Sequence, residues 1–212
     1  MKQAPLTPHG FQEICWVSDG ALGRLETFVA LLEKWRTKIN LVGRGSLADP
    51  WRRHILDSAQ LGPLLPPDTR SIADIGSGAG FPGLVLALID LPGGPDVHLI
   101  ESNQRKCAFL REVNRATGAG AVIHHCRIEN LSNLSVDVAT ARGVAPLTKL
   151  LQFAVPILKK NGKCFFLKGK KWQDELNKAK KDWNMEESYI PSLSNSSGMV
   201  LKLEALSRRH DS

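Results

Sequence analysis

The chain has 212 residues, 42% of them hydrophobic, and a formal net charge of +7 at pH 7. This length and apolar content predict one domain of ordinary size with at most a small extension. No apolar run approaches the roughly 18 residues of a membrane helix and no signal peptide follows Met1, so we expect a cytoplasmic protein that does not enter a membrane.

The cysteines lie apart from one another, without the C-x-x-C spacing of metal or redox sites, at Cys15, Cys107, Cys126 and Cys164. This distribution predicts reduced, cytosolic core residues. The histidines form no ligand-like set with them, and His124 and His125 simply follow a strand-like segment. We therefore expect no bound metal.

Residues 10–62 have the spacing of helices. In residues 25–39 the apolar side chains recur at helical intervals, which leaves most charged residues outside that stripe. Asp49 and Pro50 form a good N-cap and first-turn pair for a further helix to about residue 61. Prolines between residues 63 and 67 then end this region. We expect an N-terminal helical extension over residues 1–66 and one compact unit over residues 67–212.

From residue 71 onward, strand-like and helix-like segments alternate, which is typical of a parallel, doubly wound α/β sheet. The expected strands are 71–75, 97–101, 121–125, 136–140 and 163–168, and the expected helices are 82–90, 104–117 and 146–159. A charged helix near 172–182 precedes two final strands, 187–190 and 199–206, of which we expect the last to be antiparallel. Gly118 and Gly162 are expected to cap helices at their C-terminal ends.

The most informative segment is residues 72–83, where a short apolar strand runs into a glycine-rich turn. Gly76, Gly78 and Gly80 allow positive φ angles and let a ligand approach the main chain. A second apolar strand ends at Glu101, about 20 residues beyond the turn, where a βαβ unit places a carboxylate on a ribose hydroxyl. The pattern predicts a nucleoside-cofactor site, and the alternative is a turn that only connects strand to helix.

Two cofactors compete for this turn. Residues 78–83 formally fit the G-x-G-x-x-G fingerprint of dinucleotide sites. Asp74, at the end of the strand, argues against a dinucleotide because its carboxylate would repel the pyrophosphate. S-adenosylmethionine has no phosphate but carries an ammonium and a sulfonium, so we expect Asp74 to attract it. Together with Glu101, this pattern is similar to the class I methyltransferase signature.

Two basic segments flank the predicted cofactor site. Nine lysines lie between Lys159 and Lys181 against only two acids, and a second basic group comprises Arg36, Lys38, Arg44, Arg52 and Arg53. A lysine-rich stretch is often only a solvated surface. Two such segments beside one site favour the other interpretation, contact with RNA. The predicted RNA contacts are Lys168, Lys170, Lys171, Lys178, Arg52 and Arg53.

Two cations follow predicted strands at the edge where open α/β sheets place their chemistry. Arg142 ends the fourth strand and Lys168 ends the fifth. His54, Asp57 and Ser58 share one helical face, but nothing supplies the oxyanion hole that a hydrolytic triad needs. We interpret these three residues as a hydrogen-bonded face that packs on the cofactor domain.

Absent motifs narrow the choice of acceptor. Amino-group methyltransferases carry an Asn-Pro-Pro-Tyr-like motif after the fourth strand. This chain has no such motif there. No Pro-Cys dipeptide offers the nucleophile that carbon-5 pyrimidine methylation requires. An acceptor that needs no activation remains, and guanine N7 is one because it has a lone pair and no proton at neutral pH. Its methylation needs positioning rather than a general base.

Taken together, these features resemble the bacterial 16S ribosomal RNA guanine-N7 methyltransferase family, also called glucose-inhibited division protein B. The matching stretches are residues 35–41, 53–58, 74–83 and 101–110, the region around Arg142, and residues 166–170, and the resemblance spans roughly 35–205. It implies a class I, Rossmann-like fold with a mostly parallel seven-stranded sheet. It also implies S-adenosylmethionine as cofactor and one target guanine in the decoding-region loop of 16S ribosomal RNA.

The resemblance also implies roles for individual residues. Arg142 would close the site near the methyl group, and Lys168 would act on cofactor or RNA, both by positioning. The loop after the third strand would hold the adenine, although a plain surface turn is the alternative for that loop. The complete set of expected cofactor contacts is Asp74, Gly76, Gly78, Gly80, Phe81, Glu101, Ile128, Glu129 and Arg142.

Two departures from the family pattern stand out. Gly143 follows Arg142 where the family commonly has alanine, and residues 195–199 lack an arginine that many members carry. Two rival functions stay open: methylation of a non-RNA substrate, and RNA binding without turnover. We expect a monomer, and the sequence leaves open whether naked RNA, an assembly intermediate or the small ribosomal subunit is the substrate.

Overall fold

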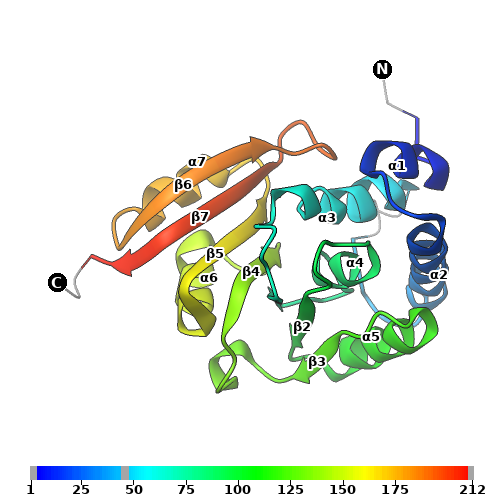
Figure 1. Ribbon diagram of the computed structural model, residues 1–212, viewed down its shortest axis with the longest axis horizontal. Coiled ribbons are helices and arrows are strands. Elements are labelled where there is room, and N and C mark those ends of the chain that lie inside the picture. Colours follow the sequence, from blue (N-terminus) through cyan, green and yellow to red (C-terminus); the bar gives the residue numbers. More distant parts are fainter. Residues whose placement is uncertain (1–3, 44–47, 210–212) are drawn as a thin grey trace.

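One seven-stranded sheet forms the centre of the computed structural model, which describes residues 4–43 and 48–209 (Figure 1). Its strand order is β3-β2-β1-β4-β5-β7-β6. The strands are β1 (Ser71–Ile75), β2 (Asp96–Glu101), β3 (Val122–His125), β4 (Val136–Arg142), β5 (Leu158–Lys168), β6 (Trp183–Pro191) and β7 (Met199–Arg208). β1 to β5 are parallel, whereas β7 is antiparallel to both of its neighbours. The predicted α/β class and mostly parallel sheet are confirmed.

The helix after β4 is shorter than predicted. α6 (Leu147–Ala154) gives way to a 3-10 turn, Val155–Ile157, because Pro156 cannot donate a helical hydrogen bond. The chain enters β5 at Leu158, so Gly162 lies inside a strand, where the β4–β5 register shifts, and its prediction as a helix cap is wrong. Gly118 does cap α5 (Gln104–Thr117), with a left-handed φ of 64°.

The N-terminal region is helical in pieces. It contains α1 (Pro8–Cys15), α2 (Asp19–Trp35), a π-helical turn (Trp51–Leu56) that continues into α3 (Asp57–Ala59), and a 3-10 turn (Gly62–Leu64). The expectation of helix throughout residues 10–62 is wrong for residues 36–43. There the backbone N–H groups of Lys38 and Ile39 both donate to the Trp35 carbonyl, which closes a turn instead of continuing the helix.

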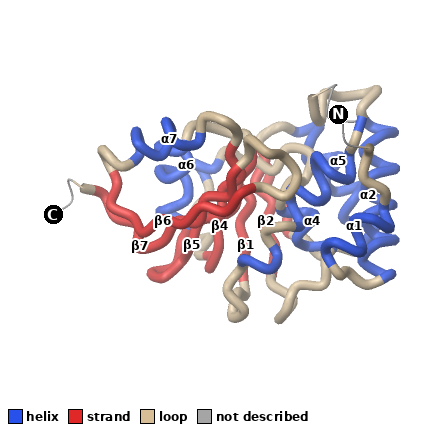
Figure 2. Tube along the Cα trace, turned by 90° about the horizontal axis from the view of Figure 1, so that it is seen from above, coloured by secondary structure: helices blue, strands red, loops and turns tan. Residues whose placement is uncertain are grey.

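Helices cover both faces of the sheet (Figure 2). α4 (Gly83–Leu88), α5 and the N-terminal helices share one core with β1 and β2. α6 and α7 (Trp172–Ala179) form the second core on the other face, against β4, β5 and β7. The N-terminal extension therefore packs on the same face as the helix that follows the glycine-rich turn.

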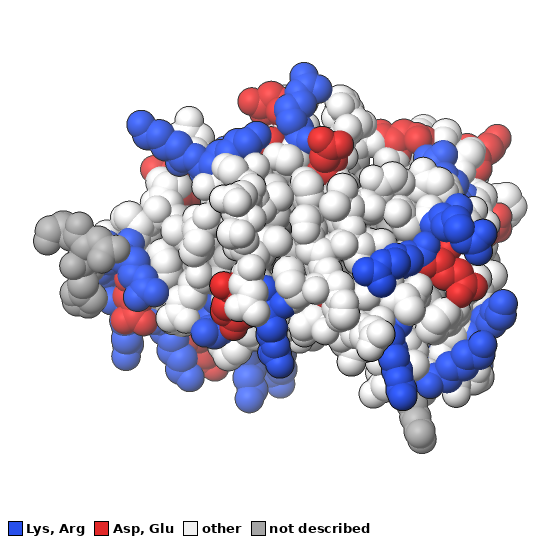
Figure 3. All heavy atoms as spheres, turned by 90° about the horizontal axis from the view of Figure 1, so that it is seen from below, with Lys and Arg blue, Asp and Glu red and all other residues white. Residues whose placement is uncertain are grey.

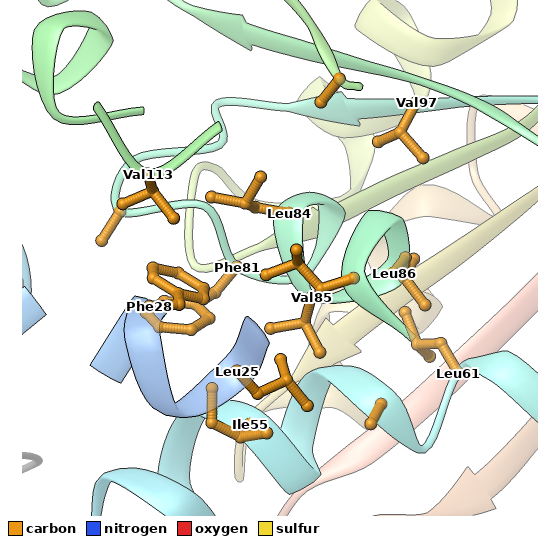
Figure 4. Packing of buried hydrophobic residues seen from close by; sticks show 14 of the residues in the cluster. Leu25, Phe28, Ile55, Leu61, Phe81, Leu84, Val85, Leu86, Val97 and Val113 are labelled. Atoms are coloured by element: carbon orange, nitrogen blue, oxygen red, sulfur yellow. The ribbon is translucent and has the colours of Figure 1, made fainter. Parts of the chain in front are cut away.

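The contact between the extension and the cofactor domain is aromatic. The Phe28 ring of α2 lies 5.1 Å from the Phe81 ring and 6.2 Å from the Phe109 ring, measured between centroids. Leu25 and Ile55 point into the same cluster (Figure 4). Each such buried side chain contributes about 1.5–3 kcal/mol to stability. The extension is thus held directly against the turn that carries the predicted site.

Within residues 4–43 and 48–209, no helix combines the length and apolar character needed to cross a membrane. The same residues contain no group of three or more His, Cys, Asp or Glu side chains that could hold a metal ion. The cysteines form no disulfide in this part of the chain, and Cys107 and Cys164 are buried.

Candidate active site

A pocket of about 440 Å³ lies at the carboxyl ends of the strands, beside the point where the strand order reverses between β1 and β4. Open α/β sheets bind their ligands at this location. The predicted residues that line the pocket are Gly76, Gly78, Phe81, Glu101, Ile128, Glu129 and Arg142. They come from four separate segments of the sequence, which the sheet brings together.

The backbone of the glycine-rich turn forms one wall of the pocket, which we call the glycine wall. Gly76 and Gly78 have φ angles of 66° and 57°, a region that side chains disfavour. A Cβ on Gly76 would lie 2.7 Å from the Val144 side chain, so packing also requires glycine there. At Gly78 the nearest atom to a Cβ is 3.8 Å away, so the added carbon would project into open space at the pocket wall. The turn therefore leaves room for a ligand against its main chain.

Glu101 is fixed at the end of β2 by the turn itself. One carboxylate oxygen accepts a hydrogen bond from the Gly78 N–H at 2.9 Å and the other accepts from the Asn103 N–H at 2.7 Å. The side chain is nearly buried yet lines the pocket. Since each carboxylate oxygen has a further lone pair, Glu101 can still accept from two ribose hydroxyls. The open glycine wall and this oriented acceptor fit S-adenosylmethionine.

Asp74 lies outside the pocket, so the structure does not bring it together with the other predicted cofactor contacts. It is completely buried, one oxygen accepts from the Gly83 N–H at 3.0 Å, and the other lies 3.3 Å from the Thr140 hydroxyl. Burial raises the pKa of Asp74 to about 7, against hydrogen bonds that lower it. A partly neutral carboxyl that anchors the first residue of α4 is poorly suited to attract a cationic ligand from a distance.

Gly80 does not line the pocket either. Its φ is 92°, and a Cβ would lie 2.8 Å from Leu84 of α4, so the residue allows a tight turn against the helix rather than ligand contact. The predicted glycine pattern therefore contains two different requirements. Gly78 leaves space for a ligand, whereas Gly80 leaves space for packing.

Arg142 lies at the rim of the pocket, and residues of the N-terminal extension hold its guanidinium in place. Its Nη1 donates to the Arg53 carbonyl and to the Asp57 carboxylate, both at 3.0 Å. Its Nη2 lies 3.0 Å from His54 Nδ1, and its guanidinium carbon lies 4.8 Å from the centroid of the Phe81 ring. All three hydrogen-bond partners of this cation thus lie more than 80 residues earlier in the chain.

His54 supports the same rim as a neutral ring. It stacks on Phe81 with a centroid distance of 4.8 Å, and its Nδ1 faces Arg142. Burial, followed by the charges of Arg142 and Arg53, lowers the pKa of His54 to about 3. Ser58 is fully buried and its hydroxyl donates to the His54 carbonyl. These contacts exclude a hydrolytic triad and confirm that this helical face packs on the cofactor domain.

Lys168 does not line the pocket, so the structure does not bring it together with Arg142 as predicted. Its side chain is only 6% exposed. The ammonium lies 2.6 Å from the Glu175 carboxylate of α7 and donates to the Ala145 carbonyl at 2.8 Å. Glu175 also accepts from the Leu147 N–H, so the ion pair ties the end of β5 to α6 and α7. Lys168 is a structural cation in this arrangement.

The remaining predicted RNA contacts divide into two groups. Lys170, Lys171, Lys178 and Arg53 are exposed. Arg52 instead pairs with Asp49 at 3.0 Å and donates to the Ala4 carbonyl. Its contacts therefore link two parts of the N-terminal extension.

Arg44, which belonged to the second predicted basic group, lies outside the described residues. On the face seen in Figure 3, basic side chains stand around the outline and leave the centre largely uncharged. That face therefore carries a basic rim instead of one continuous basic patch.

Sequence reasoning missed several residues of the pocket. Leu41 and Val42, from the non-helical segment of the extension, form part of its wall, as do Lys106 and Phe153. No local pattern marks these four residues as ligand contacts, because they reach the pocket only through tertiary packing. Asp57 was noticed only as part of a helical face, although the R-H-x-x-D spacing could have indicated a shared partner.

Comparisons with known sequences agree with this geometry. The family model described as rRNA small subunit methyltransferase G (GidB) matches residues 21–200. A protein named ribosomal RNA small subunit methyltransferase G from Paramagnetospirillum magneticum is 50% identical over 192 residues, which cover 91% of this chain and 92% of that protein. A protein of the same name from Rhodospirillum rubrum is 47% identical over 203 residues, covering 96% and 100%.

Solved structures share the fold at low identity. An O-methyltransferase from Bacillus cereus in complex with SAH has a TM-score of 0.57 and 11% identity, over 84% of this chain and 90% of that one. A ribosomal protein L11 methylase from Lactobacillus delbrueckii subsp. bulgaricus has a TM-score of 0.55 and 16% identity, over 72% and 79%. These neighbours show a Rossmann-like methyltransferase fold, and the sequence match over most of the chain shows that the protein belongs to the rRNA small subunit methyltransferase G (GidB) family.

Proposed function

We propose that this protein transfers a methyl group from S-adenosylmethionine to N7 of a guanine in the decoding-region loop of 16S ribosomal RNA. The observation that carries the proposal is the pocket itself, where an open glycine wall and Glu101 lie opposite the anchored Arg142. The names of the relatives, which specify small-subunit ribosomal RNA, support the choice of substrate. We expect a cytoplasmic monomer.

The residues of the pocket would act by holding two reactants in line. The cofactor supplies an electrophilic methyl group on a sulfonium. The N7 lone pair attacks the methyl carbon while the carbon–sulfur bond breaks and its electrons stay on sulfur, so positive charge moves to the base. No proton leaves N7, and the chain needs to supply orientation instead of a general base. Glu101 and the turn orient one reactant, and Arg142 orients the other.

The histidine that contacts Arg142 is unsuited to act as a base. His54 Nδ1 already accepts from Arg142, and the low pKa of His54 makes the ring a weak proton acceptor at neutral pH. Arg142 is a cation with fixed geometry, which suits contact with an RNA phosphate or with the cofactor carboxylate. We therefore expect a single-turnover rate that is nearly flat between about pH 6 and 8.

Exposed cations would hold the RNA backbone. Lys170, Lys171 and Lys178 lie on α7 and the loop before it, and Arg53 lies beside Arg142. Such contacts fix register and contribute affinity without reading sequence. Lys168 and Arg52 are left out of this set because both are held in internal ion pairs.

Incubation with labelled S-adenosylmethionine and small ribosomal subunits from a modification-deficient strain tests the proposal. Label is expected at N7 of one guanine in the decoding-region loop, and a parallel reaction with deproteinised 16S ribosomal RNA compares the two forms of substrate. Label on a different base, or turnover without RNA, would replace the proposed acceptor. RNA binding without any transfer would favour a non-catalytic role.

A further inference from the structure

A second cavity, of about 380 Å³, adjoins the cofactor pocket. The two share four lining residues, Leu41, Val42, Arg142 and Gly143, so they lie side by side, and together we call them the groove. The other residues of the second cavity come from the extension and from the loop between β6 and β7, and they are Gly43, Arg53, His54, Asp57, Ser194 and Asn195. Three segments that are remote in sequence therefore line it.

One carboxylate connects these three segments. Asp57, in the extension, accepts from Arg142 Nη1 through one oxygen at 3.0 Å. Its other oxygen accepts from the Ser194 hydroxyl and, at 3.4 Å, from the Ser192 hydroxyl of the β6–β7 loop. Gln60 reinforces the same contact, because its side-chain oxygen accepts from the Leu193 N–H at 2.8 Å and its amide donates to Asp57.

Arg142 keeps donors available after these contacts are made. Nη1 uses both of its hydrogens, on Arg53 and Asp57, and Nη2 uses one on His54. A guanidinium has five N–H donors, so two are left, and neither finds a partner in residues 4–43 and 48–209. Asp57 therefore fixes the plane of the guanidinium while leaving an edge that can contact a ligand.

We propose that the second cavity receives the acceptor base and that Asp57 is a positioning residue for methyl transfer, acting through Arg142 and the β6–β7 loop. This inference rests on the proposed function. Enzymes that modify a nucleobase place it in a pocket outside the stack, and a cavity contiguous with the cofactor pocket meets that need. The ligand class is a purine nucleotide of single-stranded or locally opened RNA.

Asp57→Asn tests the proposal, because the amide keeps the shape of the side chain and removes its charge. The single-turnover rate with saturating 16S ribosomal RNA and cofactor is expected to fall about tenfold to a hundredfold, the scale of a small misplacement of reactants. The dissociation constants for S-adenosylhomocysteine and for RNA are expected to stay unchanged. A merely structural role would lower the melting temperature without this selective loss of rate.

Asp90→Asn is the matched control. Asp90 joins the extension to the cofactor domain through Arg24 at 3.0 Å and through Ser18, and it does not line either cavity. This variant is expected to lower the melting temperature and to leave the rate at the wild-type value. An equal loss of rate in both variants would show that any weakening of the contact between the extension and the cofactor domain impairs the enzyme. That result would overturn the positioning role of Asp57.

A double-variant cycle gives a second, independent measurement. Because Asp57 acts through Arg142 and the β6–β7 loop, Asp57→Asn combined with Arg142→Ala should be slower than Arg142→Ala alone by no more than the factor that Ser194→Ala costs in the wild type. Fully multiplicative losses would overturn the proposal. Ser194→Ala removes only the loop contact, and a reduced rate in this variant is expected even where Asp57→Asn fails to fold; an unchanged rate there would overturn the role of the loop wall. Failure of the proposed function is distinguishable, because wild-type protein would then yield no 7-methylguanine.

Discussion

The two ends of the groove are built in different ways. At the cofactor end, Glu101 holds Gly78, a contact between residues 23 positions apart within one βαβ unit. At the acceptor end, Arg142 is held by residues 85 and 88 positions earlier, and Asp57 in turn holds Ser194 across 137 positions. The cofactor end is therefore a local property of the sheet domain, whereas the acceptor end exists only when the extension and the β6–β7 loop are docked.

The largest effect is expected from a side chain placed into the cofactor end. Gly78→Val should abolish S-adenosylhomocysteine binding, measured by calorimetry, because the branched side chain would occupy the open pocket wall. Gly118→Val is the control, since it carries a similar φ of 64° with no atom within 4 Å of a Cβ. Both variants bear a backbone strain of about 1–2 kcal/mol, so equal loss of binding would attribute the effect to strain.

Arg142→Ala should separate the two ends by its kinetics. The single-turnover rate is expected to fall about a hundredfold with RNA and cofactor both saturating, because the acceptor loses its positioning group. Affinity for S-adenosylhomocysteine should change little, since the glycine wall and Glu101 are intact. A large loss of cofactor affinity with an unchanged rate would assign Arg142 to the cofactor end instead.

Glu101→Gln and Asp74→Asn compare a carboxylate that lines the cofactor end with one that is buried outside it. Glu101→Gln should weaken S-adenosylhomocysteine binding about tenfold to a hundredfold, because charge-assisted hydrogen bonds contribute about 1.5–3 kcal/mol. Asp74→Asn should leave that affinity unchanged, since Asp74 lies outside the pocket. Calorimetric titration of both variants decides between them, and the reverse order of effects would return Asp74 to the role of ligand.

The lysines give a smaller effect that extends the comparison to the RNA. Neutralising Lys170, Lys171 and Lys178 together should reduce the slope of log affinity against log salt by about 2, because fewer counterions are released. Cofactor affinity should not change. Lys168→Gln is the contrasting variant, expected to lower the melting temperature by breaking the Glu175 ion pair without flattening the salt slope. An unchanged slope in the triple variant would make these lysines a solvated surface only.

The smallest effect is on the pH dependence of the free energy of unfolding, to which Asp74 and His54 contribute in opposite directions. The folded-state pKa of Asp74, about 7, lies above the ordinary 3.8, so stability from this group falls as pH rises between about 4 and 7. The folded-state pKa of His54, about 3, lies below the ordinary 6.5, so stability from this group rises with pH between about 3 and 6.5. The two slopes, each at most about 1.4 kcal/mol per pH unit, oppose one another in the shared window.

Single variants should expose each slope. In urea unfolding between pH 4.5 and 6.5, Asp74→Asn should make the free energy of unfolding rise more steeply with pH than in the wild type. His54→Gln should make it fall with pH. An Asp74→Asn profile parallel to that of the wild type would contradict the raised pKa.

The same contrast explains how far the sequence could be interpreted. The alternation of strands and helices, the glycine wall and Glu101 follow from short-range patterns, because a βαβ unit places those residues by its own geometry. Whether a polar residue at a strand end faces the ligand depends on partners elsewhere in the fold. Asp74 is hydrogen-bonded to Gly83 and Thr140, and Lys168 is paired with Glu175. Both side chains are therefore held away from the pocket.

The acceptor end was predictable only in part. Arg142 was identified from its place at the end of β4, but its partners could not be, since helical spacing groups His54 with Asp57 without showing what they face. The wall formed by Leu41 and Val42 has no sequence signal, because apolar residues after a helix resemble any core segment. Long-range side-chain contacts are the information that local patterns lack.

The docking of the extension against Phe81 has a consequence for recombination between relatives. The Phe81 ring stacks on Phe28 and His54 of the extension. It also contacts the guanidinium of Arg142, which comes from the sheet domain. A chimera that joins residues 1–66 of one family member to the remainder of another must therefore inherit both halves of this contact from compatible parents. Such exchanges should preserve cofactor binding more readily than methyl transfer, which makes residue 66 a poor place to cross over.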